Sequence, residues 1–152
     1  MKTLILGLGN PILSDDSIGI REAQAIEQHC RDEAVTVMEA SQAGLNLLDL
    51  IVGYDKLILI DAIQTMSGDI GEVYRLEASD LASTLHTGSP HDINLATALE
   101  LGKKLGMDLP REIVVFAIEV KDVTTFSEEC TPEVTRAIAV AKDMVIRELS
   151  NA

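Results

Sequence analysis

One stretch of the chain, GLGNPILSDDSIG (residues 7–19), joins an apolar run to an amphipathic run. Its glycines look like the start of a phosphate-binding turn. The dinucleotide fingerprint G-x-G-x-x-G, however, needs glycine at position 12, and this chain has Ile12 there. Asp15 and Asp16 follow at the start of the expected helix, where their charges would repel a pyrophosphate. We therefore expect the glycines to bring the backbone close to something other than phosphate.

Strand and helix patterns alternate on both sides of this stretch. Apolar runs predict buried strands at Thr3–Gly9, Val35–Ala40, Leu57–Ile63 and Ile113–Val120. An alternating run predicts a half-exposed strand, for which an antiparallel orientation fits, at Gly71–Leu76. Helical periodicity covers Ser14–Cys30, Leu45–Val52, Ser89–Leu105 and Thr131–Leu149. The alternation predicts one domain over residues 1–152, a three-layer α/β sandwich with a mostly parallel twisted sheet of about five strands and helices on both faces.

Composition restricts the classes of partner. The chain has 152 residues and a formal net charge of −13 at pH 7, so its surface repels nucleic acid and anionic membrane, and neither is an expected partner. Cys30 and Cys130 are too few and too far apart for a disulfide framework, and we expect two ordinary buried thiols in a reducing compartment. The N-terminus does not resemble a signal peptide, and no run reaches the roughly 20 apolar residues that cross a bilayer. A cytoplasmic protein is the resulting expectation.

The carboxylates become informative when they are considered together. Asp61 closes the buried run LILIDAI (residues 57–63), where packing alone gives no reason for a charge. In open α/β sheets, ligands bind beyond the carboxyl ends of the strands, where the strand order reverses. If the third strand lies beside the first, Asp61 and Asp16 face the same crevice. The structural alternative is that Asp61 anchors a loop and that Ser14 or Asp15 caps the first turn of a helix, where acidic side chains are favoured.

A third candidate is His91, in the sequence Ser-Pro-His-Asp (residues 89–92). This sequence is typical of a helix start, with a serine cap, proline at the first position and an acidic third position. The positive end of the helix disfavours imidazolium, so the ring stays neutral, as metal binding requires. A surface histidine is the structural alternative. His86 lies in a loop without such a frame and is a weaker candidate, and His29 lies near a helix end.

Two carboxylates and one imidazole make an open metal site. Asp16, Asp61 and His91 would leave coordination positions for water or a substrate atom, and this donor set suits Ni²⁺ or Zn²⁺ better than Ca²⁺ or Cu⁺.

On these residues the sequence resembles the hydrogenase maturation endopeptidases, which process the large subunit of [NiFe] hydrogenases. The N-terminal pattern of that family is a strand, G-x-G-N, four residues, an acidic pair and a glycine three residues later. The matching positions here are Gly7, Gly9, Asn10, Asp15, Asp16 and Gly19. The family's second ligand falls on Asp61 and its third on His91. One departure follows the second strand, where the family often has Asp-Gly-Gly-Thr and this chain keeps only the acidity, at Glu39.

The resemblance implies a function. It implies an endopeptidase that removes a C-terminal tail from a nickel-loaded large-subunit precursor, with Asp16 and Asp61 as catalytic residues. The metal held by these carboxylates and His91 is then the nickel of the substrate, although other divalent metals such as zinc fit the same donors. Either the metal polarises the scissile carbonyl, or a carboxylate activates water beside it. The sequence shows no Ser, Cys or Thr nucleophile with a partnered base.

A phosphoryl-accepting receiver domain is the main alternative. It too has five α/β units, an acidic pair after the first strand, an aspartate closing the third strand and a lysine after the fifth. Asp15, Asp16, Asp61 and Lys121 are the corresponding residues. A receiver, however, places its acidic pair directly at the strand end, and it gives no role to Asn10 or His91.

Overall fold

A computed structural model describes residues 1–41, 45–65, 67–77 and 92–150. The strands are β1 (Thr3–Leu8), β2 (Val35–Ala40), β3 (Lys56–Ile63), β4 (Val73–Glu77) and β5 (Glu112–Glu119). The helices are the 3-10 turn η1 (Ser14–Ser17), α1 (Ile18–Glu27), α2 (Leu45–Ile51), α4 (Asp92–Lys104) and α5 (Pro132–Ser150). The expected alternation of strands and helices is thereby confirmed. The helix expected from Ser14 differs, because it begins as one 3-10 turn and ends at Glu27.

The strands form one sheet in the order β2-β1-β3-β5-β4. Four strands are parallel, and the edge strand β4 runs antiparallel to β5, with alternating half-buried and exposed residues. The expected neighbours β1 and β3 are paired from Thr3 opposite Lys56 to Gly7 opposite Ile60. The chain goes from β1 outward to β2 and then back past β1 to β3, so the strand order reverses between β1 and β3. The carboxyl ends of these two strands are therefore the place where a ligand is expected.

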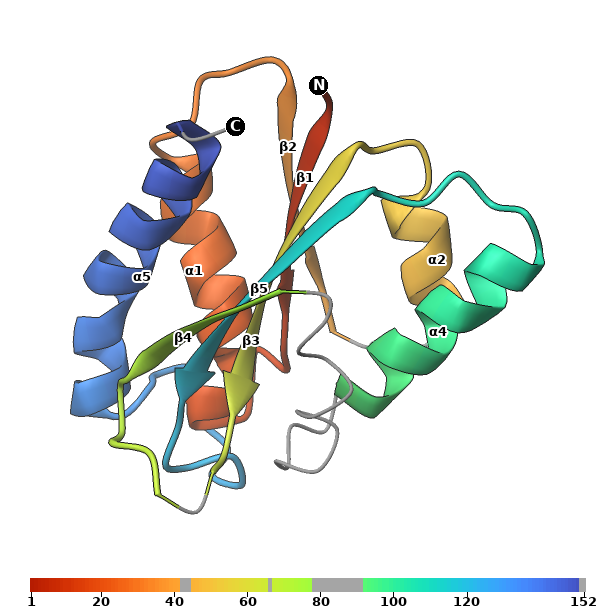
Figure 1. Cartoon of the computed structure of the whole chain (residues 1–152). Coiled ribbons are helices and arrows are strands. Elements are labelled where there is room, and N and C mark those ends of the chain that lie inside the picture. The colour runs from red at the N-terminus through yellow and green to blue at the C-terminus, as the bar shows by residue number, and fades with distance from the viewer. Residues whose placement is uncertain (42–44, 66, 78–91, 151–152) are drawn as a thin grey trace.

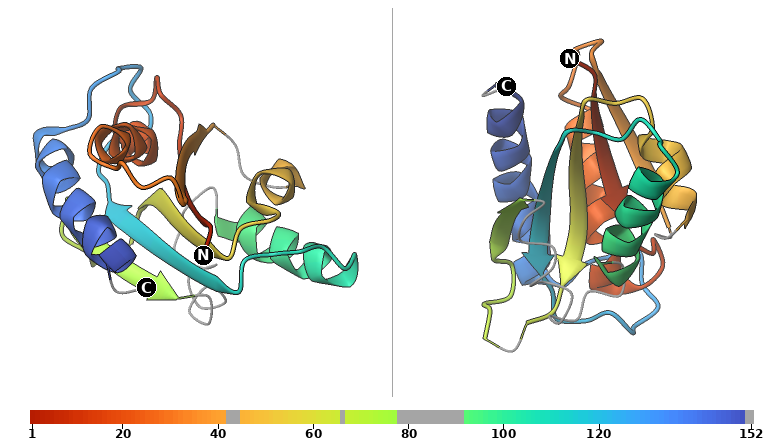
Figure 2. Two further views of the ribbon diagram at one scale, coloured as in Figure 1. Left: turned by 90° about the horizontal axis from the view of Figure 1, so that it is seen from above. Right: turned by 45° about the vertical axis from the view of Figure 1, so that its right-hand side comes forward.

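Helices cover both faces of the sheet, as Figures 1 and 2 show. Helices α1 and α5 lie against each other on one face, and α2 and α4 lie against each other on the opposite face. The result is the three-layer arrangement expected from the sequence.

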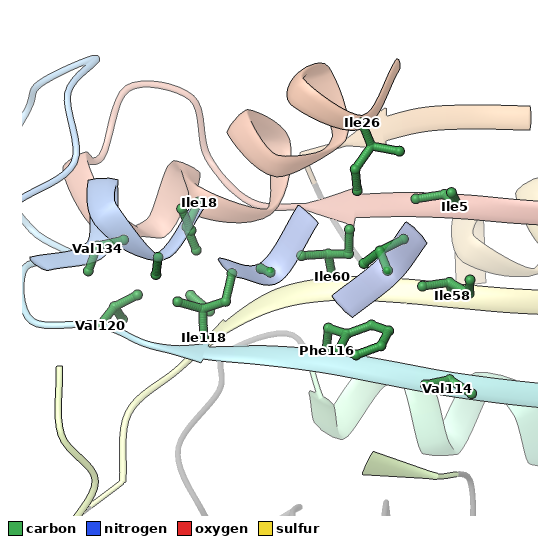
Figure 3. Close-up of a cluster of buried hydrophobic side chains, with 14 residues drawn as sticks. Ile5, Ile18, Ile26, Ile58, Ile60, Val114, Phe116, Ile118, Val120 and Val134 are labelled. Carbon is green, nitrogen blue, oxygen red and sulfur yellow. The ribbon is translucent and has the colours of Figure 1, made fainter. Parts of the chain in front are cut away.

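Strand alternation gives the two faces different cores. The face under α2 and α4 is rich in leucine, with Leu4, Leu6 and Leu8 of β1 beside Leu57 and Leu59 of β3. The face under α1 and α5 is built from isoleucine, valine and the buried Phe116, as Figure 3 shows. Central strands that are apolar on both faces are typical of a sheet covered on both sides.

Three glycines of the opening stretch allow close packing of the backbone. A Cβ on Gly7 would collide with the carbonyl of Gly19, and a Cβ on Gly19 would collide with the backbone of Leu8 and Ile60. A Cβ on Gly9 would meet the carbonyl oxygen of Asp16. The glycines thus bring the backbone close to the protein's own helix start. Helix α1 begins in direct contact with β1 because no side chain separates them.

Candidate functional site at the carboxyl edge of the sheet

Two expected site residues lie buried at the same edge of the sheet. Asp16 is 6% exposed and Asp61 is 1% exposed. Asp16 belongs to η1, which follows β1 and packs against β3, the strand that carries Asp61. The condition stated for a shared crevice, that β1 and β3 be neighbours, is therefore met.

Asp61 lies on the leucine-rich face of β3. Leu57 and Leu59 belong to the core under α2 and α4, while Ile58 and Ile60 belong to the opposite core. Alternation therefore places Asp61 on the side covered by α4. The pairing of β3 with β1 ends at Ile60, so Asp61 is the first residue of β3 beyond that ladder. One carboxylate oxygen accepts a hydrogen bond from the N–H of Ala62 at 2.8 Å.

The loop that carries Asp16 is fixed by its own backbone. The N–H of Asn10 donates to the carbonyl of Asp16 at 3.1 Å, and the N–H of Asp16 donates to the carbonyl of Leu13 at 2.9 Å. The Asn10 side chain accepts a hydrogen bond from the N–H of Ile12 at 3.1 Å, which closes an Asx turn around Pro11. Asn10 thus has a structural task in a loop that returns to its own start.

Asp15 has a different task from Asp16. Its side chain accepts hydrogen bonds from the N–H groups of Lys121 (3.0 Å), Asp122 (2.9 Å) and Thr131 (2.6 Å) and from the Thr131 hydroxyl. The capping alternative is wrong for both residues considered, because neither η1 nor α1 has a side-chain cap and the Ser14 hydroxyl donates to the carbonyl of Glu129. Asp15 instead clamps the loop after β5 onto the loop after β1.

The other candidates lie outside the described residues or on the edge strand β2. His91 and His86 lie outside the described residues, whereas α4, which directly follows His91 in the chain, begins at the carboxyl edge of the sheet (Figure 1). Glu39 is exposed in β2, opposite Gly7. Within the described ranges alone, no group of three or more His, Cys, Asp or Glu side chains could hold a metal ion.

One buried carboxylate at this edge, Glu119, was not among the site residues expected from the sequence. It ends β5 on the same face as Asp61, is 1% exposed, and accepts hydrogen bonds from the N–H (2.8 Å) and hydroxyl (2.5 Å) of Thr65. It also accepts one from the Tyr74 hydroxyl at 3.1 Å. Burial, followed by this hydrogen bond, raises the pKa of Tyr74 to about 12. Glu119 closes the apolar run IVVFAIE (residues 113–119) as Asp61 closes its own run, so the same signal could have found it.

The hydroxyl and thiol groups near the clamp are engaged in local contacts. The Ser17 hydroxyl donates to the carbonyl of Ser14 at 2.6 Å and lies 3.5 Å from the Cys130 sulfur. Burial raises the pKa of the Cys130 thiol, which disfavours the reactive thiolate. These groups therefore have the features of structural residues and not of activated nucleophiles.

Comparisons with known proteins agree on one family. Residues 20–148 match the family model described as hydrogenase maturation protease. The hydrogenase 2 maturation protease of Escherichia coli K12 is 28% identical over 151 residues, covering 98% of this chain and 91% of that protein. The solved structure of the hydrogenase maturating endopeptidase HybD from E. coli superposes with a TM-score of 0.89 at 27% identity, covering 99% of this chain and 93% of HybD. The [NiFe] hydrogenase maturation protease HybD from Thermococcus kodakarensis shares the fold, with a TM-score of 0.78 at 23% identity over 97% and 98% of the two chains.

Among the described residues, no helix combines the length and the apolarity that a membrane span requires.

Proposed function

The chain belongs to the hydrogenase maturation protease family and is a peptidase, and from this premise we propose that it removes a C-terminal tail from the nickel-loaded large-subunit precursor of a [NiFe] hydrogenase. The observation that carries the proposal is the pairing of β1 with β3. This pairing puts Asp61 and the η1 turn of Asp16 at one edge, at the point where the strand order reverses.

In this proposal the nickel ion belongs to the substrate. The carboxylates of Asp16 and Asp61 and the imidazole of His91 hold it, and the remaining positions stay with the precursor. Zinc and other divalent ions suit the same donors when precursor is absent. A metal shared between two proteins positions the scissile peptide bond and converts recognition of a filled nickel site into cleavage.

Two routes to hydrolysis fit this proposal. The nickel polarises the scissile carbonyl, or Asp16 or Asp61 accepts a proton from the attacking water. Both routes add one water across one peptide bond. Neither requires a covalent acyl-enzyme, in keeping with the structural roles of Ser14, Ser17 and Cys130 described above.

Intact-mass measurement on a nickel-loaded large-subunit precursor tests the function. The wild-type chain should release one C-terminal peptide, and nickel-free precursor should remain uncut. Absence of cleavage in the loaded precursor would contradict the proposed reaction, and equal cleavage with and without nickel would contradict the role of the metal.

Asp16→Asn tests the ligand role. The change replaces a charged donor with a weak neutral one, so processing should fall sharply while the melting temperature stays near that of the wild type. Asp69→Asn is a matched control, because Asp69 is an exposed acid in the turn between β3 and β4. Normal processing by Asp16→Asn would remove Asp16 from the site.

His91→Ala extends the test to the third donor. It should abolish binding of nickel or zinc in calorimetry, and unchanged binding would exclude His91.

The receiver-domain alternative is not favoured. The family match concerns proteases, and Asp15, one of the acidic pair that a receiver requires, is engaged with the loop after β5.

A further inference from the structure

Two loops at the carboxyl edge are joined by hydrogen bonds into one unit. The N–H of Ser127 donates to the carbonyl of Ile12 at 2.9 Å, and the N–H of Ser14 donates to the carbonyl of Ser127 at 2.9 Å. These bonds form a short parallel bridge between Leu13 and Ser127. The Asp15 clamp holds the same two loops together a few residues further on. In Figure 1 the loop after β1 and the loop after β5 lie at the lower edge of the molecule, where the parallel strands end.

This unit exposes apolar side chains at its end. Phe126 is 80% exposed and Ile12 is 50% exposed, and Pro11 beside Ile12 is exposed as well. We call these three residues the apolar tip. The chain has two phenylalanines and no tryptophan, and the other phenylalanine, Phe116, is 1% exposed in the core. Among the described residues, Phe126 is the most exposed of the large apolar side chains, and aromatic side chains are enriched where proteins contact one another.

The backbone of the tip is held in place before any partner arrives. The Asp122 carboxylate accepts hydrogen bonds from the N–H groups of Thr124 (3.1 Å) and Thr125 (3.0 Å) on one side of Phe126. On the other side, the Ser127 hydroxyl accepts one from the N–H of Glu129 at 3.1 Å. A preformed loop loses little conformational entropy on association, which favours binding through a few apolar anchors.

The surroundings of the tip indicate the chemistry of its partner. Glu128 and Glu129 are exposed beside it, the Arg21 guanidinium donates to the carbonyl of Pro11 at 3.1 Å, and the whole chain carries a net charge of −13. A hollow of about 360 Å³ between the start of α5 and α1 is lined by Arg21, Glu128, Glu129, Cys130, Thr135 and Ile138, so Phe126 and Ile12 lie outside it. Exposed side chains outside a cavity suit a protein surface better than a small molecule. The complementary surface is an apolar socket with basic side chains around it, and a second copy of this acidic chain lacks that charge complementarity.

We propose that the apolar tip docks on the folded body of the precursor protein whose tail the edge cleaves. This inference rests on the proposed function and deepens it. The loop that exposes Ile12 leads within four residues to Asp16, so a partner seated on the tip is continuous with the candidate site. Docking on the body of the precursor adds affinity that does not depend on the cleaved peptide, and it selects a particular large subunit by the shape of its socket.

Steady-state processing of nickel-loaded precursor, followed by intact mass, separates docking from chemistry. Phe126→Ala should raise KM by about tenfold or more while kcat stays near that of the wild type, because the lost contact serves ground state and transition state equally. Ile12→Ala should act in the same direction. Val140→Ala is the matched control, since Val140 is 55% exposed on α5, and it should leave both constants unchanged.

The outcomes distinguish this proposal from the one on which it rests. Cleavage by the wild-type chain with unchanged KM in Phe126→Ala would overturn the docking role and leave the proposed function intact. Failure of the wild-type chain to cleave loaded precursor would overturn both. Sedimentation adds one more outcome: a wild-type dimer that Phe126→Ala converts to monomer would assign the tip to self-association and overturn docking on the precursor.

Discussion

Asp15→Asn is the substitution that best tests the clamp between the loops after β1 and β5. The Asp15 side chain is fully buried, with no exposed surface. Its Oδ2 accepts the N–H groups of Lys121 and Asp122, and its Oδ1 accepts the N–H of Thr131. Both oxygens therefore face backbone donors. An asparagine in either orientation must turn its NH₂ group toward at least one of those N–H groups.

The expected cost follows from the number of bonds lost. A hydrogen bond to a charged group contributes about 1.5–3 kcal/mol, and a buried donor left without a partner costs about 1–3 kcal/mol. The variant replaces every charged hydrogen bond with a neutral one and leaves one or two backbone N–H groups facing the NH₂ group of asparagine. We therefore expect the free energy of unfolding to fall by about 3–5 kcal/mol. For a chain of this size, this corresponds to a fall in melting temperature of about 6–20 °C.

Urea unfolding followed by circular dichroism measures the loss directly. The midpoint should fall while the slope stays unchanged, because the surface exposed on unfolding is the same. Asp122→Asn is the matched control: Asp122 is only half-buried, and an asparagine oxygen still accepts the N–H groups of Thr124 and Thr125. If the free energy of unfolding of Asp15→Asn lay within about 1 kcal/mol of the wild-type value, the clamp would not hold the loops together. The Asp15 carboxylate would then contribute little to the free energy of unfolding.

Three further perturbations test the packing and the buried charges. Gly19→Ala should cost about 1–3 kcal/mol in urea unfolding, because its methyl group meets the carbonyl of Leu8; native stability would mean that α1 shifts freely against β1. Burial raises the pKa of Glu22 from 4.5 to about 8, so the folded state binds the extra proton and stability should fall as pH rises from about 5 to 8. Glu22→Gln should remove that slope, and a flat wild-type profile would refute the assignment. Lys56→Met removes a 1%-exposed cation that lies 3.0 Å from Glu148 and should cost about 1–3 kcal/mol; a rise in the thermal midpoint would show that apolar packing outweighs the ion pair.

The sequence alone predicted the layers and the order of the elements. Apolar runs such as residues 57–63 exclude water on both faces, and a strand of that kind needs helices on both sides. The site hypothesis added one condition, that the third strand lie beside the first, under which Asp16 and Asp61 share one edge. The described structure confirms the pairing, whereas the assembly of these residues with His91 into a metal site stays a prediction.

Local patterns failed where a side chain bonds to a distant segment. Ser14 and Asp15 have the residue types and the position of helix caps, yet their partners lie more than 100 residues away, at Glu129 and Lys121–Thr131. Glu119 differs, because a carboxylate that closes an apolar run was visible in the sequence; only its partners Thr65 and Tyr74, from the preceding connection and strand, required the structure.

What the sequence by itself determined is what depends on neighbours along the chain: strand and helix periods, the glycines that let α1 approach β1, and the acidic residues available at the strand ends. The tertiary structure alone decided how those acidic residues divide their work. Asp15 and Asp16 are adjacent and chemically alike, but the loop after β5 brings three N–H groups to Asp15. A buried N–H group needs an acceptor, so in this fold the Asp15 carboxylate serves the N–H groups of the loop. Asp16 is therefore the member of the pair for which we propose a role in the site.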